Sequence, residues 1–133
     1  MADPIEIVLA FLTRINEHDV DGIAAMITDD HLFVDSLGNR VQGREKMRGA
    51  WQSYFQMCPD YRVSHEEIFR GGATVAVFGS AGGTIAADGK LSEQSRWQTP
   101  AAWMARVEDG RISEWRVYAD NKPVYEILGR LKK

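Results

Sequence analysis

One carboxylate, Asp35, lies in an otherwise apolar stretch and is the first candidate for chemistry in this chain. The stretch from His31 to Gly38 alternates like a β-strand, which predicts that Asp35 shares a face with Phe33 and Leu37. In an apolar pocket the charged form of Asp35 would be poorly solvated, so its pKa would rise toward the range useful for proton transfer. The alternative is that Asp35 caps the turn that follows, a common role for aspartate.

A second carboxylate, Asp120, follows a strand-like segment and precedes a short helix-like one. It is a candidate for a second acid or base, and capping of the helix is the competing interpretation. Tyr54, Gln98 and His31 could orient a ligand carbonyl or hydroxyl. Gln98 is expected to share a cavity-facing side of its strand with Ala102, whereas a surface position is the simpler interpretation for His31.

Large aromatic side chains are frequent for so short a chain, with four tryptophans among the 133 residues. Each of them taken alone is best explained by core packing, but together they could line a pocket for an apolar ligand. We therefore predict Asp35 and Asp120 as the catalytic pair. The predicted substrate-binding residues are His31, Phe33, Trp51, Tyr54, Gln98, Ala102 and Trp115.

Signatures of metal and nucleotide sites do not stand out in this sequence. The three histidines are far apart and share no ligand spacing with carboxylates, so we predict no metal site. No glycine-rich loop follows a strand into a helix, and we expect no cofactor. The single cysteine, Cys58, permits no internal disulfide and is expected to be a buried small hydrophobe.

Length and composition are those of one ordinary globular domain spanning residues 1–133. A net charge of −3 gives no electrostatic reason to expect nucleic acid or an anionic membrane as a partner. No apolar run approaches the roughly 20 residues that span a bilayer, and no secretory signal is apparent. A cytoplasmic location is therefore the expectation.

Hydrophobic periodicity and capping residues predict the order of the elements. Asp3 and Pro4 begin a helix that extends to about Ile15. The further elements are expected over residues 20–27 (helix), 31–37 (strand), 44–58 (helix), 61–70, 73–87, 96–107 and 111–119 (strands) and 122–131 (helix). Pro100 indicates that its strand is bulged or at an edge at that point.

Helices first and hairpin-connected strands afterwards predict an α+β domain, with an antiparallel sheet covered by helices on one side. Gly79, Gly82 and Gly83 lie in one predicted strand, where glycines allow a sheet to curl sharply. A curled sheet closed by the N-terminal helices forms a cone with an internal cavity. Cavities of this kind bind small molecules.

Three segments resemble the nuclear-transport-factor-two-like superfamily, and its SnoaL-like polyketide cyclase branch most closely. They are Asp19-Val20-Asp21-Gly22-Ile23, Phe33-Val34-Asp35 and Gly110-Arg111-Ile112-Ser113-Glu114-Trp115-Arg116-Val117-Tyr118-Ala119-Asp120. The resemblance covers nearly the whole chain and implies the cone-shaped fold of ketosteroid isomerases. It also implies a homodimer formed through the outer face of the sheet.

The resemblance also implies roles for particular residues of this chain. Asp35 falls where the isomerases place the Asp that moves a proton, and Asp120 where cyclases and epoxide hydrolases carry an acid or base. The two oxyanion-hole positions of the isomerases fall on Phe11 and Ala102, which have no suitable donor. An isomerase of that mechanism is therefore not expected.

The sequence thus supports two interpretations. The first is a cofactor-free isomerase, cyclase, dehydratase or hydrolase that uses Asp35 as acid or base on a small apolar substrate. The second is a non-catalytic ligand-binding or dimerisation module of the same fold. An open cavity with an unpaired Asp35 would favour the enzyme. A plugged cavity, or an Asp35 bonded to turn amides, would favour the module.

Overall fold

The structure, a computed structural model, describes residues 3–132. Four helices, α1 (Pro4–Asn16), α2 (Val20–Ala25), α3 (Arg44–Met57) and α4 (Lys122–Leu131), accompany six strands and one 3₁₀ turn. The strands are β1 (Ile27–Val34), β2 (Arg40–Gln42), β3 (Arg62–Gly71), β4 (Thr74–Thr84), β5 (Arg96–Glu108) and β6 (Arg111–Ala119), and the turn is η1 (Glu93–Ser95). Most predicted elements are present, and β2 was not predicted.

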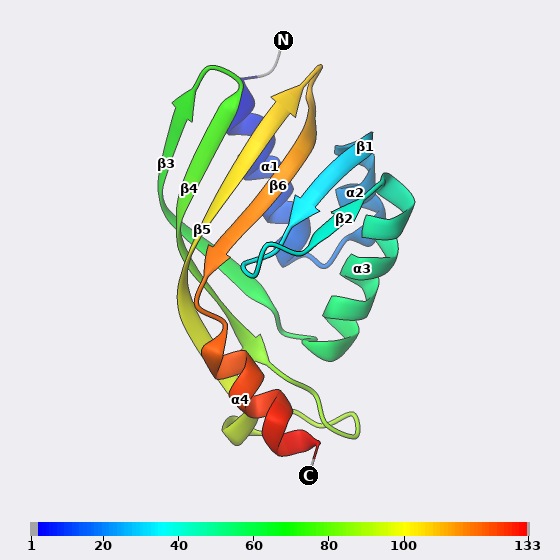
Figure 1. Cartoon of the computed structure of the whole chain (residues 1–133), viewed down its shortest axis with the longest axis vertical. Helices are drawn as coiled ribbons and strands as arrows, with labels where there is room; N and C mark the ends of the chain where they lie inside the picture. Colours follow the sequence, from blue (N-terminus) through cyan, green and yellow to red (C-terminus); the bar gives the residue numbers. More distant parts are fainter. Residues whose placement is uncertain (1–2, 133) are drawn as a thin grey trace.

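All six strands form one curved sheet in the order β2-β1-β6-β5-β4-β3 (Figure 1). Neighbouring strands pair antiparallel except β1 and β6, which run parallel. Helix α1 lies behind the sheet, α3 flanks it beside β1 and β2, and α4 closes its lower end (Figure 1). The predicted α+β class with a curved, helix-covered sheet is confirmed.

Local sequence signals place the first two helices. The Asp3 side chain accepts a hydrogen bond from the Ile5 amide, and Asp19 accepts one from the Gly22 amide, as expected of N-caps. Helix α2 ends at Ala25 rather than at Ile27, because Ile27 already pairs with β6 as the first residue of β1. Pairing in the sheet therefore overrides the helical periodicity at this position.

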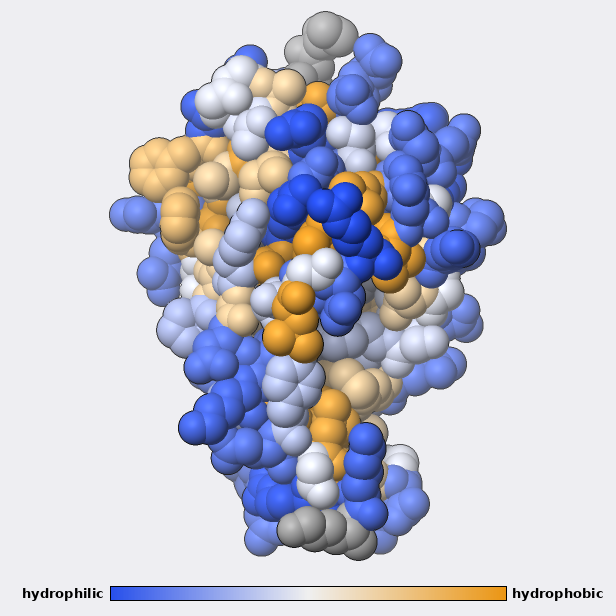
Figure 2. All heavy atoms as spheres, in the orientation of Figure 1, coloured by the Kyte–Doolittle hydropathy of each residue, from blue (hydrophilic) through white to orange (hydrophobic). Residues whose placement is uncertain are grey.

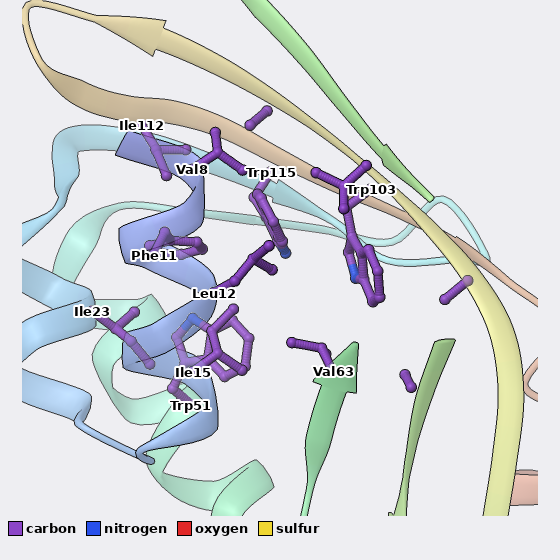
Figure 3. Packing of buried hydrophobic residues seen from close by; sticks show 14 of the residues in the cluster. Val8, Phe11, Leu12, Ile15, Ile23, Trp51, Val63, Trp103, Ile112 and Trp115 are labelled. Atoms are coloured by element: carbon purple, nitrogen blue, oxygen red, sulfur yellow. The ribbon is translucent and has the colours of Figure 1, made fainter. Parts of the chain in front are cut away.

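Helix α1 packs into the concave face of the sheet. Its buried Phe11 meets Trp115 of β6 edge-on, with ring centroids 4.9 Å apart. Figure 3 shows Trp103 and Trp115 projecting from the sheet, while Trp51 faces them from the helical side. The core therefore lies between α1, α3 and the sheet, and its aromatic side chains come from both layers.

The end of α1 is fastened to β3 by polar contacts. Asn16 Nδ2 donates to the Val63 carbonyl at 2.9 Å, and the Val63 amide donates back to Asn16 Oδ1 at 2.8 Å. His18 Nε2 lies 2.8 Å from the Tyr61 carbonyl, and its ring stacks on Phe55 with centroids 4.1 Å apart. A side-chain amide here imitates strand pairing, so the helix and the sheet keep one fixed spacing.

The sheet bends at a bulge within the antiparallel pair β3–β4. The pairing register shifts between His65 and Glu67, opposite Gly79. A Cβ atom on Gly79 would lie 1.8 Å from the Ser64 carbonyl oxygen, so no side chain fits without moving the backbone. The bulge and the glycine together turn the lower part of β3 and β4 around the cavity side of the sheet.

No helix within residues 3–132 is long and apolar enough to cross a bilayer.

We expect Gly79→Ala to lower the free energy of unfolding by about 3 kcal/mol or more, because the new methyl group collides with backbone rather than with a side chain. Gly49→Ala is the matched control, since Gly49 lies in α3 with open space around its Cβ position. That change should stabilise the protein by about 0.5–1 kcal/mol. Urea unfolding of both variants measures the difference, and equal stabilities would contradict the proposed bend.

Candidate functional site

A cavity of about 310 Å³ lies between the concave face of the sheet and helices α3 and α4. Residues from α1, β1, α3, β3, β4, β5, β6 and α4 line it, so segments from nearly the whole chain meet there. Its lining includes the exposed side chains of Ala50 and Tyr125, which place its opening between α3 and α4. The volume is at the lower end of the range for ligand pockets, about 300 to 1,000 Å³.

All four tryptophans of the chain line this cavity. They are Trp51 of α3, Trp97 and Trp103 of β5, and Trp115 of β6. The rings of Trp103 and Trp115 stack with centroids 6.4 Å apart. Each tryptophan is buried in the core, and each also lines the cavity. The two interpretations made from the sequence, core packing and pocket lining, therefore both apply to the tryptophans.

Asp35 lies at the cavity, directly after β1, and is half-buried. Its Oδ1 accepts hydrogen bonds from the amides of Leu37 and Asn39, both at 2.9 Å, and its Oδ2 accepts one from Asn39 Nδ2 at 3.1 Å. Asp35 therefore lies at the cavity, but its hydrogen bonds to turn amides are the arrangement that favours the non-catalytic binding module over the enzyme. Asp35 faces the cavity together with Phe33, and it caps the turn at Gly38.

Asp120 lies outside this cavity. Its side chain is exposed, and Oδ1 accepts the Lys122 amide at 3.0 Å at the start of α4. It borders a shallow surface depression that shares Ser36, Asn121 and other residues with the cavity lining. The Asp120 side chain thus caps the start of α4. Of the predicted catalytic pair, Asp35 lines the cavity and Asp120 does not.

The prediction that Gln98 and Ala102 face the cavity is wrong. The residues of β5 alternate, and Trp97, Thr99, Ala101 and Trp103 are buried on the concave face. Gln98 is exposed on the opposite face, and Ala102 is paired there with Tyr118 and Phe78. A strand's side chains alternate with a period of two, so the bulky apolar set takes the core side and its neighbours point outward.

Pro100 was expected at a bulge or an edge, and it lies at a local edge. The pairing of β5 with β6 begins at Ala101, so Pro100 is paired with β4 alone. The missing amide donor therefore costs no hydrogen bond of the ladder.

His31 is buried with 1% of its surface exposed, so its interpretation as a surface histidine is wrong. Its Nδ1 donates to the Ile112 carbonyl of β6 at 2.7 Å, and burial lowers the pKa of the imidazole below the usual 6.5. His31 does not belong to the cavity lining. Its neutral ring instead links β1 to β6 where the register of the parallel pair shifts.

Two tyrosines that carry hydroxyl groups line the cavity: Tyr54, which was predicted, and Tyr61, which was not. Their rings meet edge-on with centroids 4.8 Å apart. Burial raises the pKa of both hydroxyls above the usual value of 10, so both stay protonated at neutral pH and can donate a hydrogen bond. Tyr61 directly follows the helix-ending Pro59-Asp60 pair, where no sequence periodicity reveals which way it points.

Sequence reasoning also missed Ser36, Asn121 and Tyr125, which lie where the cavity opens. Asn121 Nδ2 donates to Ser36 Oγ at 2.8 Å, linking the turn after β1 to the start of α4. These residues are 85 positions apart in the chain, so only folding brings them together.

Cys58 is completely buried, as expected, and burial raises the pKa of its thiol to about 11. The thiol is therefore protonated and unreactive at neutral pH. Within residues 3–132, no group of three or more histidine, cysteine, aspartate or glutamate residues lies close enough to hold a metal ion.

Comparison with known families matches residues 8–115 to the SnoaL-like domain, which covers most of the chain. This protein belongs to the SnoaL-like domain family. Among curated proteins, no relative matches the sequence significantly. Family membership confirms the resemblance seen in the sequence.

Solved structures show the same fold. A Catenulispora acidiphila protein with a ketosteroid isomerase-like fold, solved with trimethylamine, aligns with a TM-score of 0.79 and 22% identity over 93% of this chain and 92% of its own. An LEH-like epoxide hydrolase from M. tuberculosis aligns with a TM-score of 0.78 and 24% identity, over 96% of this chain and 90% of its own. IdmH of Streptomyces antibioticus, a candidate polyketide cyclase, aligns with a TM-score of 0.78 and 24% identity, over 96% of this chain and 99% of its own. At these identities the likeness establishes the fold alone.

Proposed function

We propose that this SnoaL-like protein binds a small, largely apolar organic molecule in the cavity behind its sheet. The observation that carries the proposal is the convergence of all four tryptophans, Asp35 and two tyrosine hydroxyls on one space of about 310 Å³. Apolar walls with a few convergent polar groups are typical of ligand pockets. The trimethylamine bound by the Catenulispora protein is consistent with a small ligand for this fold.

Intrinsic fluorescence tests this proposal directly, because every tryptophan of the chain lines the cavity. A panel of small neutral compounds, such as indole, benzyl alcohol and cyclohexenone, should produce saturable changes in tryptophan emission. Ala101→Leu should weaken this binding at least tenfold, because the larger side chain occupies the cavity.

The matched control is Ala102→Leu, the same change one residue further along β5 and on the opposite face. Its binding curves should equal those of the wild type. Failure of this panel and of the choline and 3,3-dimethylbutan-1-ol used below to bind at millimolar concentration, or equal binding to the Ala101→Leu variant, would contradict the proposal.

Catalysis is the second candidate, favoured by the position of Asp35. In this hypothesis Asp35 takes a proton from a carbon of the bound ligand, directly or through water, and the Tyr54 hydroxyl donates to the ligand's carbonyl oxygen. Oδ2 of Asp35 receives only the Asn39 side chain, which leaves it a free lone pair for the proton. The named epoxide hydrolase and candidate cyclase share this fold.

Proton abstraction can be detected without knowing the substrate. The wild type should accelerate incorporation of solvent deuterium at the saturated carbon beside the carbonyl of cyclohexenone, followed by NMR. Asp35→Asn should reduce the acceleration by about a hundredfold, the usual size of a general-base contribution. Asp120→Asn should leave it unchanged, because Asp120 caps α4 outside the cavity. Equal rates for wild type and Asp35→Asn would exclude Asp35 as the base.

We also propose that the protein forms a homodimer through the outer face of the sheet. Phe69, Phe78 and Tyr118 are 56%, 46% and 56% exposed there. The rings of Phe69 and Phe78 lie 6.0 Å apart, and Figure 2 shows hydrophobic surface gathered over β3 and β4. Exposed aromatic clusters of this kind are typical of protein contacts.

Light scattering after size exclusion measures the oligomeric state. The wild type should have the mass of a dimer, and Phe78→Glu should shift it to the monomer by placing a charge in the contact. Gln56→Glu adds the same charge on the exposed side of α3 and should leave the dimer intact. A monomeric wild type would contradict the proposal.

A further inference from the structure

Among the described residues 3–132, Asp35 is the only one with a charged side chain that lines the cavity. The other lining residues, all within the described range 3–132, are apolar, aromatic or neutral polar, and none is lysine, arginine or histidine. The cavity therefore has a fixed negative charge and no positive charge beside it. A bound anion would be repelled by Asp35 and would find no positively charged side chain in the cavity lining to compensate for its lost hydration.

Aromatic rings form a large part of the remaining wall. Eight lining residues are aromatic. Tyr54, Tyr61 and Trp97 form a continuous series, with centroids 4.8 Å and 6.1 Å apart, and the stacked Trp103 and Trp115 add a second group. The face of an aromatic ring is negative and attracts cations, most strongly for tryptophan.

Asp35 is held in place for such a role. Three N–H groups of its turn occupy three of the approximately four lone-pair positions of the carboxylate. Donors of this kind fix the orientation of the carboxylate. The remaining lone pair, on Oδ2, is free for a ligand, and the turn holds the carboxylate in one orientation.

We propose that the cavity is specific for small organic cations, namely tertiary or quaternary ammonium compounds with a short uncharged substituent. The ammonium group lies near Asp35 and the aromatic faces, and the substituent fills the apolar part of the cavity. A methylated ammonium suits this site better than a primary one, because its methyl groups bury well and need no hydrogen-bond acceptors. This inference rests on the ligand-binding function proposed above and names the ligand class.

The sharpest test compares choline with 3,3-dimethylbutan-1-ol, in which carbon replaces the charged nitrogen and the shape is kept. Titrations followed by tryptophan fluorescence should show choline binding at least tenfold more tightly than the alcohol. In Asp35→Asn the affinity for choline should fall about tenfold, while that for the alcohol changes less than twofold. Asp120→Asn, which removes a carboxylate outside the cavity, should change neither affinity.

A second variant tests the rings independently of Asp35. Tyr61→Leu keeps an apolar wall but removes one aromatic face, so it should weaken choline binding by severalfold and binding of the alcohol by less. Thermal unfolding of each variant confirms that it is folded before its affinities are compared.

The outcomes distinguish this inference from the proposed function. If the alcohol binds as tightly as choline, or if the neutral panel binds and choline does not, specificity for cations is wrong and ligand binding stands. If neither choline, the alcohol nor any compound of the neutral panel binds, both proposals fail. If Asp35→Asn leaves the preference for choline unchanged, Asp35 is not the counter-charge and the inference is overturned.

Discussion

The sharp bend of the sheet at the register shift between β3 and β4 determines whether this protein has a cavity. Gly79 lies so close to the Ser64 carbonyl that a methyl group would collide with backbone, and the register shift beside it adds curvature. Without this bend the lower halves of β3, β4 and β5 would continue straight, and Val63, Ala81 and Trp97 would not face α3 across an enclosed space. The cavity therefore depends on having glycine at position 79, where any side chain would collide with the backbone.

Helix α1 keeps the bent sheet and its lining at a fixed separation. The paired hydrogen bonds between Asn16 and Val63 and the contact of His18 with Tyr61 join the end of the helix to the start of β3. Tyr61 is thereby fixed at the cavity through its own backbone. The same contacts that stabilise the fold position an aromatic ring in the candidate site.

Asp35 shows why a single residue can satisfy both a structural and a functional interpretation. Its hydrogen bonds to Leu37 and Asn39 close the turn between β1 and β2, and its position after Phe33 places it at the cavity. The same bonds that make it a good turn residue make it a fixed charge, which suits an anchor for a ligand cation.

The sequence by itself determined the order of the elements, the α+β class and the family, because helix caps, periodicity and glycine turns act locally. Phe33, Asp35, Trp51, Tyr54 and Trp115 were predicted as site residues, and all five line the cavity, while their catalytic and binding roles stay predictions. Tertiary structure decided which face of β5 points inward, so that Ala101 and Trp103, and not Gln98 and Ala102, meet the ligand space. It also placed Asp120 outside, His31 in the core, and Tyr61 and Asn121 at the cavity. Alternation in a strand specifies two faces but not which one is covered, and this is decided only by the helices that pack against the sheet.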